Sequence, residues 1–265
     1  MTEDPEVLYE VADHIATITL NRPERMNTIS SPMLAQITKA FIAADADPDV
    51  RVVIFTGKGR AFCAGLDLAA ATKAGKGLGM SETASTNLDL RETPPTVMFN
   101  MGTPTICALN GSAAGYGIDM ALGCDMRIMA EGSKMSVAFT KRGIVPESGG
   151  TWFLPRLVGW SKAAELIFTG RTLGSAECLE TGLVSRVVPA DEVQSTARAL
   201  AVEIAANAPL AVQAAKRMMR MGLSEGFNDH VHHVFLQLLP LLNSADSREG
   251  MLAFMEKREA VFEGR

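Results

Sequence analysis

The feature that most constrains the fold of this 265-residue chain is an alternation of short apolar segments with helix-like segments. Residues 52–56 and 105–109 are too short for buried helices and rich in β-branched side chains, which is typical of strands covered on both faces. Ser31 and Pro32 are typical of the N-cap and first turn of a helix, here predicted to run to about residue 46. The alternation continues to about residue 188 and predicts an α/β fold.

The pattern changes after Asp191, where only helical segments follow. We predict helices at residues 191–207, 209–222, 224–241 and 246–258. The chain therefore divides into an α/β core, residues 1–190, and a helical region, residues 191–265. Within the core a ββα unit recurs weakly, with strands near residues 7–20, 52–56, 105–109 and 184–188.

Charge and cysteine content exclude several classes of protein. A formal net charge of −5 argues against a non-specific nucleic-acid-binding protein, which needs a basic surface. The cysteines lack Cys-x-x-Cys spacing, so we expect reduced, buried thiols and no metal site: Cys63, Cys107, Cys124 and Cys178. Residues 1–14 lack the order of a signal peptide, and no apolar run is long enough to span a bilayer. We expect a cytoplasmic protein that binds neither nucleic acid nor membrane.

Two stretches place small residues where a strand gives way to a helix: RAFCAGLDL (60–68) and LNGSAAGYGID (109–119). Unpaired N–H groups at a helix start can receive an anion or a developing oxyanion, and small residues let a ligand approach them closely. Two such starts facing one cleft would form an oxyanion hole. The alternative for each stretch alone is ordinary tight packing between a strand and a helix.

Other motifs carry weaker signals. Neither a phosphate-binding loop nor a dinucleotide fingerprint is present. His230 and His233 have the spacing of zinc ligands on a helix, but no third ligand is evident, which favours a solvated or interfacial helix.

The stretch KRGIVPESGGTW (141–152) contains one carboxylate, Glu147, between a proline and a Ser-Gly-Gly turn. Loops of this kind often carry functional residues. Glu147 has two interpretations at this point: a capping or first-turn acid for the following helix, or a group that transfers a proton.

Several blocks, in order along almost the whole chain, resemble the crotonase superfamily, the enoyl-CoA hydratase/isomerase family. They include ITLNRPERMN, FTGKGRAFCAGLDL, CALNGSAAGYGIDMALGCDMRI, GIVPESGGTWFLPRLVG and FMEKREAVFEG. The resemblance implies a spiral of ββα repeats, with residues 1–190 binding acyl-CoA and a C-terminal helical trimerisation region. It also implies a homotrimer or a hexamer of paired trimers. Coenzyme A would enter as part of the substrate, with no separate cofactor and no metal.

The resemblance also assigns binding residues by position. The oxyanion hole would use the backbone N–H groups of Leu66 and Tyr116. The side chains expected near coenzyme A are Arg25, Ala64, Asp67, Leu68, Phe254 and Lys257, the last two from the same or a neighbouring subunit. Residues 70–100, with Tyr116, Phe139 and Trp152, would shape the acyl pocket.

The acid/base positions depart from the hydratase pattern of two glutamates. Asp119 occupies the first position, whereas the second is Phe139, which cannot hold a water. Glu147 aligns with the acid/base of several enoyl-CoA isomerases, so the leading hypothesis is an isomerase in which Glu147 moves the proton and Asp119 assists. Phe139 would then help to exclude water. The alternatives are a hydratase in which Asp119 and Glu147 hold a water, and a non-catalytic acyl-CoA-binding protein.

Overall fold

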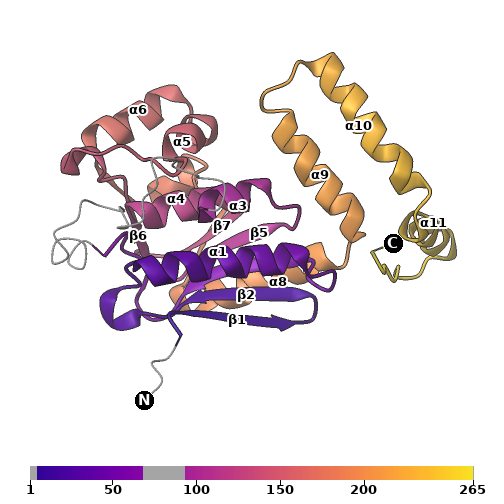
Figure 1. The fold of residues 1–265 in the computed structure, drawn as a ribbon, viewed down its shortest axis with the longest axis horizontal. Coiled ribbons are helices and arrows are strands. Elements are labelled where there is room, and N and C mark those ends of the chain that lie inside the picture. The colour runs from indigo at the N-terminus through magenta and orange to yellow at the C-terminus, as the bar shows by residue number, and fades with distance from the viewer. Residues whose placement is uncertain (1–4, 68–92, 265) are drawn as a thin grey trace.

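The computed structural model describes residues 5–67 and 93–264, which form two sheets surrounded by helices (Figure 1). The larger sheet has the strand order β1-β2-β3-β5-β7-β10, in which only the β1–β2 pair is antiparallel. Its strands are Val7–Ala12, Ile15–Leu20, Val52–Gly57, Thr105–Leu109, Met126–Ala130 and Arg186–Val188. The smaller sheet has the order β4-β6-β8-β9, with strands Ala61–Cys63, Ser112–Ala114, Lys134–Ser136 and Thr172–Gly174.

A repeating ββα unit accounts for this arrangement. Strands β3, β5 and β7 of the larger sheet are each followed by a short strand of the smaller sheet, β4, β6 and β8. Helices follow β2, β6 and, after a short 3-10 turn, β8. The helices of the core are α1 (Ser31–Ala46), α3 (Pro94–Asn100), α4 (Tyr116–Gly123), α5 (Gly150–Val158), α6 (Trp160–Thr169), α7 (Ser175–Glu180) and α8 (Val193–Ala205). The 3-10 turns are η1 (Pro23–Arg25), η2 (Thr140–Arg142) and η3 (Ala190–Glu192). The predicted α/β fold and its repeat are therefore confirmed.

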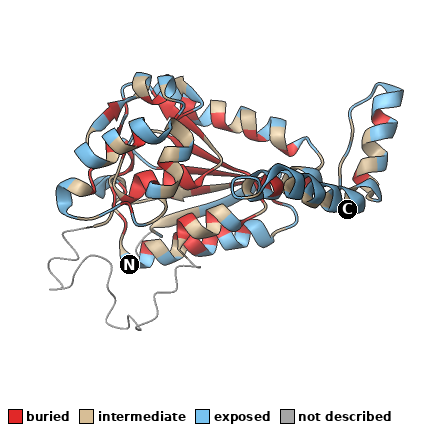
Figure 2. Ribbon diagram, turned by 90° about the horizontal axis from the view of Figure 1, so that it is seen from above, coloured by how far each residue is buried: buried red, intermediate tan, exposed pale blue. Residues whose placement is uncertain are grey.

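Strands β3 and β5, at the centre of the larger sheet, are buried on both faces, as their continuous apolar sequences predicted. In β3, Val53 and Phe55 join the core that contains α1, whereas Val52 and Ile54 face α8. Successive side chains of a strand point to opposite faces, so a strand between two helical layers must be apolar at every position. Figure 2 shows the buried residues concentrated in the sheet and its flanking helices.

The start of α1 differs slightly from the prediction. Its N-cap is Ser30 rather than Ser31, because the Met33 N–H donates to Ser30 Oγ over 3.1 Å. Both serines suit the position, and only the backbone geometry distinguishes them. Of residues 70–100, the segment predicted to help shape the acyl pocket, only residues 93–100 are described, and they include α3.

The helical region beyond residue 191 has two parts. Helix α8 packs on the larger sheet through Val193, Ala197 and Ala201. Helices α9 (Pro209–Met221), α10 (Phe227–Leu242) and α11 (Ala245–Glu256) extend away from the core (Figure 1). Helix α10 contains no buried residue although most of its length is apolar. No helix in the described ranges is both long and apolar enough to cross a membrane.

Candidate active site

The two predicted oxyanion motifs interlock at the ends of neighbouring strands. Strand β4 pairs in parallel with β6, which places the chain after Cys63 beside the chain after Ala114. A Cβ on Gly65, whose φ is +95°, would lie 2.9 Å from the Ala114 carbonyl oxygen and 3.6 Å from the Tyr116 nitrogen. A Cβ on Gly117 would lie 2.5 Å from the Cys63 carbonyl oxygen. Glycine is therefore required at both positions for this close approach.

The backbone geometry leaves Leu66 and Tyr116 suitable as donors. Ile29 donates its N–H to the Gly65 carbonyl, and Asp67 donates to the Ile29 carbonyl, in a parallel bridge. In that pattern the N–H of Leu66, between them, points away from Ile29. Tyr116 is the first residue of α4, where N–H groups have no partner within the helix. The structure brings the two predicted donors together, and their role as an oxyanion hole stays a prediction.

Asp119 lies in the first turn of α4 and is completely buried, with 0% of its surface exposed. The Ser148 N–H donates to its Oδ2 over 3.2 Å, whereas Oδ1 has no hydrogen-bond partner in the described part of the chain. Burial above all, and the charge of Glu147 in addition, raise the pKa of this carboxyl from 3.8 to about 8, and the hydrogen bond from the Ser148 N–H opposes both effects. Asp119 is therefore mainly protonated at neutral pH.

The Gly149-Gly150 pair allows α5 to approach Asp119. A Cβ on Gly150 would lie 2.4 Å from Asp119 Oδ1 and 2.7 Å from the Pro146 Cβ. Gly149 has a φ of +110°, and a Cβ there would lie 2.8 Å from the Phe153 ring. The glycines thus bring the loop that carries Glu147 directly onto the buried carboxyl group.

Glu147 itself is exposed and lines a cleft of about 870 Å³. Helix α5 begins at Gly150 with Gly149 as its N-cap, no side chain caps it, and its first turn has no acidic residue. This geometry contradicts the capping interpretation of Glu147. The side chain remains available for chemistry in the cleft.

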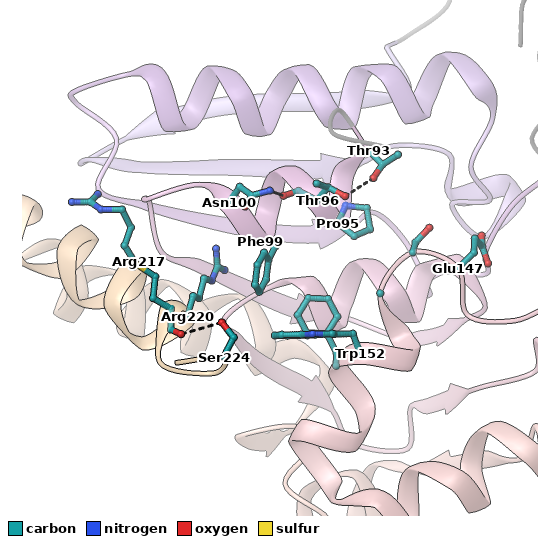
Figure 3. Close-up of a pocket in the computed structure, with 14 residues that line it drawn as sticks. Thr93, Pro95, Thr96, Phe99, Asn100, Glu147, Trp152, Arg217, Arg220 and Ser224 are labelled. Atoms are coloured by element: carbon teal, nitrogen blue, oxygen red, sulfur yellow. Dashed lines mark hydrogen bonds between the residues drawn. The ribbon is translucent and has the colours of Figure 1, made fainter. Parts of the chain in front are cut away.

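The cleft lies between helices α3, α5 and α9 (Figure 3). Three aromatic rings form one wall: Phe99 and Trp152 pack edge to face at 5.1 Å, as do Trp152 and Phe153. Trp152 thus lines the cleft, as predicted for the acyl pocket. The other lining residues are Thr93, Pro95, Thr96, Asn100, Ser148, Gly149, Arg217, Arg220, Met221 and Ser224.

Phe139, also predicted for the acyl pocket, is not among the described lining residues of this cleft. It is only 3% exposed and belongs to the main hydrophobic core, immediately before η2. Its side chain fills space in the interior that a glutamate would occupy only at a large desolvation cost. Tyr116, a third pocket residue, is also buried, and burial raises the pKa of its phenol.

Two of the residues predicted near coenzyme A form an ion pair. Asp67 Oδ2 lies 3.2 Å from Arg25 Nη1 and equally far from Arg22 Nη2. The arginines border a second cleft of about 440 Å³, lined by Glu6, Asn21, Arg22, Pro23, Glu24, Arg25 and Lys58. Ala64 lies close by, since its N–H donates to the Met26 carbonyl. Leu68 lies outside the described residues.

Phe254 and Lys257 are far from this second cleft within one chain. Phe254 is 85% exposed on α11, and Lys257 ends that helix in a left-handed conformation. The segment between β2 and α1, which contains η1, lies at the left of Figure 1, whereas α11 lies at the right. One chain by itself therefore does not bring Arg25 and Lys257 together.

Sequence reasoning did not single out three residues of this region: Arg22, Ser148 and Arg217. Arg22 and Ser148 could have been found, since each lies within one of the quoted blocks. Phe99 lies within residues 70–100, the segment predicted to shape the acyl pocket, whereas Arg217 lies outside every quoted block and reaches the cleft only in the folded protein. The predicted histidine pair binds Glu225, with Nδ1 of His230 at 3.2 Å and of His233 at 3.0 Å. No group of three or more His, Cys, Asp or Glu side chains in the described ranges is placed to hold a metal ion.

The ββα fold and the interlocked glycine loops define the class of this protein. Its sequence matches the enoyl-CoA hydratase/isomerase family over residues 10–265, and the chain belongs to this family, within the crotonase superfamily. It is accordingly a crotonase-type enzyme.

Individual relatives are named for different reactions. The chain is 34% identical to the 1,2-epoxyphenylacetyl-CoA isomerase of Escherichia coli over 265 residues, covering 98% of each chain. It is also 34% identical to the (E)-benzylidenesuccinyl-CoA hydratase of Thauera aromatica over 260 residues, 97% of this chain and 99% of that one. The crystal structure of an enoyl-CoA hydratase from Bacillus anthracis superposes with a TM-score of 0.89 at 33% identity, covering 98% of this chain and 100% of that one. These similarities establish the family and leave isomerase and hydratase as alternatives.

Proposed function

We propose that this enzyme shifts the double bond of an enoyl-CoA thioester by proton transfer through Glu147. The observation that carries the proposal is the unequal placement of the two acids. Glu147 supplies the one carboxylate among the described residues that line the large cleft, whereas Asp119 is buried behind its loop with a raised pKa. One carboxyl group exposed in the cleft and one buried and mainly protonated suit a single shuttle better than a pair that must activate water together.

The proposed reaction needs one base and two backbone donors. The N–H groups of Leu66 and Tyr116 would bind the thioester oxygen and stabilise the enolate that forms there. Glu147 would remove a proton from C2 of a 3-enoyl thioester, the C2–C3 double bond would form as the C3–C4 double bond breaks, and Glu147 would then deliver a proton to C4. Coenzyme A would enter only as part of the substrate, and the reaction would need no further cofactor.

Hydration is the second candidate, favoured by the unpartnered Oδ1 of Asp119. A buried acceptor of this kind can hold an ordered water. The hydratase mechanism would require that water to contact both Asp119 and Glu147.

Product analysis in deuterated water separates the two reactions. With a 3-enoyl-CoA, we expect the 2-enoyl isomer with deuterium incorporated at an allylic carbon and no mass gain of water, because Glu147 exchanges its proton with solvent between steps. Mass spectrometry of the products measures both quantities. A 3-hydroxyacyl product formed from a 2-enoyl-CoA as the main reaction would reject the isomerase proposal.

We also propose that the protein forms a homotrimer, or a hexamer of two trimers, through its C-terminal helices. The support is the amount of apolar surface on α10, where the exposed side chains include Phe227, Val231, Val234, Phe235, Leu236, Leu238, Leu239 and Leu242. A helix exposing so many apolar residues requires a partner surface. Sedimentation velocity should give three or six times the 28.3 kDa chain mass. A monomer at micromolar concentration would contradict this assembly.

A further inference from the structure

The large cleft has opposite charges at its two ends. Glu147 lies at one end and Arg217 at the other, with Phe99 and Trp152 between them (Figure 3). The aromatic wall suits an apolar acyl chain, whereas the exposed guanidinium of Arg217 adds a positive charge at one end of the cleft. A simple aliphatic substrate would not use this charge.

Neighbouring residues on α9 hold Arg217 in place. Lys216 Nζ lies 2.7 Å from Asp125 Oδ2, and Arg220 Nη2 lies 2.8 Å from Asp125 Oδ1. Lys216 immediately precedes Arg217, and Arg220 follows it by three positions. Together they fix the helix turn that carries Arg217. Arg217 Nη1 lies beside Gly102, 3.4 Å from the position that a Cβ on this glycine would occupy. The side chain is thus attached to a rigid part of the molecule.

Of the cations Lys216, Arg217 and Arg220 on α9, Arg217 is the one that no acid in the described ranges neutralises. Asp125 pairs with Lys216 and Arg220, and Arg220 also stacks over the Phe99 ring at 4.9 Å. Arg217 has no ion pair with any residue in the described ranges, and the remaining described lining of the cleft offers only Glu147 as an acid. An unpaired guanidinium presents a planar fork of donors, which matches a carboxylate better than any other common acyl substituent.

We propose that the acyl group of the substrate carries a carboxylate at the end remote from the thioester, and that Arg217 binds it. The proposal rests on the proposed function, because that function places the reacting carbons near Glu147. Binding of the remote carboxylate would hold an extended acyl chain along Phe99 and Trp152. An uncharged chain of the same length would leave the guanidinium partly desolvated and unpaired, so the cleft would also discriminate against it.

Saturated thioesters test this recognition apart from any reaction. Calorimetry would compare three saturated acyl-CoA ligands of equal length ending in a methyl group, a carboxylate or the methyl ester of that carboxylate. We expect the carboxylate to bind about tenfold or more tightly than either neutral ligand, as for a hydrogen bond to a charged group. Arg217→Gln should abolish this preference, and Arg217→Lys should retain part of it. The control variant Arg186→Gln removes an exposed guanidinium on β10, outside the cleft. It should retain the preference for the carboxylate ligand.

The outcomes separate this proposal from the proposed function. Equal binding of the three ligands, or a carboxylate preference that survives in Arg217→Gln, would overturn the role of Arg217 even if the enzyme isomerises enoyl thioesters. A preference lost in Arg217→Gln supports the role, including in an enzyme that proves to be a hydratase, because saturated ligands undergo neither reaction.

Discussion

The Glu147→Gln enzyme is expected to lose about 10²–10⁴-fold in kcat, with little change in the affinity for a saturated acyl-CoA. Glutamine keeps the shape of the side chain in the cleft but cannot accept a proton from C2 of the substrate. Asp119→Asn is expected to lose much less, about tenfold, because the buried aspartic acid is mainly protonated at neutral pH and is not part of the described cleft lining. Steady-state kinetics with the isomerised substrate would measure both variants.

The relative sizes of these two effects distinguish the mechanisms. If Asp119→Asn loses as much activity as Glu147→Gln, both carboxyl groups act on one water and the hydratase mechanism is favoured. Glu180→Gln provides a matched control, since Glu180 is exposed on α7, outside the described cleft lining. The control should retain wild-type activity.

The free energy of unfolding is expected to fall as the pH rises from about 4 to about 8, relative to that of the Asp119→Asn variant. The folded-state pKa of Asp119 is about 8, against an ordinary value of 3.8, so between these values the folded protein binds a proton that the unfolded chain has released. The associated stability is fully present below the lower value and lost by the upper one, at up to about 1.4 kcal/mol per pH unit and roughly 6 kcal/mol in total at most. Asparagine does not titrate, and any cost of its buried amide is independent of pH.

Urea unfolding from pH 5 to 9, at one protein concentration, would measure this difference. In a Glu147→Gln background the transition should move to lower pH, because the Glu147 charge contributes to the raised pKa of Asp119. Parallel stability curves for the wild type and Asp119→Asn would show that Asp119 ionises normally in the folded protein. The assignment of Glu147 as the sole proton shuttle would then lose its support.

Local sequence patterns carried most of the correct predictions. The short apolar runs at residues 52–56 and 105–109 gave strands buried on both faces, because their composition excludes a solvated face. The glycines of the two motifs predicted close strand-to-helix approaches, which occur at Gly65 and Gly117. Glu147 was singled out as the one carboxylate between a proline and a Ser-Gly-Gly turn, and the family resemblance favoured a catalytic role, which stays a prediction. These features depend on residues near one another in the chain.

Predictions that needed distances between remote segments were less complete. Phe139 was placed at the acyl pocket by alignment alone, but it packs in the interior beside η2. Phe254 and Lys257 were assigned to coenzyme A, yet one chain keeps them far from Arg25 (Figure 1). Arg217 was not considered, because nothing near it in sequence indicates that α9 closes one side of the cleft.

The sequence by itself determined the alternation of strands and helices, the family, and the presence of two candidate acids. Only the tertiary structure decided that these acids differ: Asp119 is enclosed by α4 and the Gly150 turn, whereas Glu147 faces the cleft. The physical reason is that secondary structure follows from side-chain periodicity over a few residues, whereas a pKa depends on the solvent and charge that distant segments bring to a site.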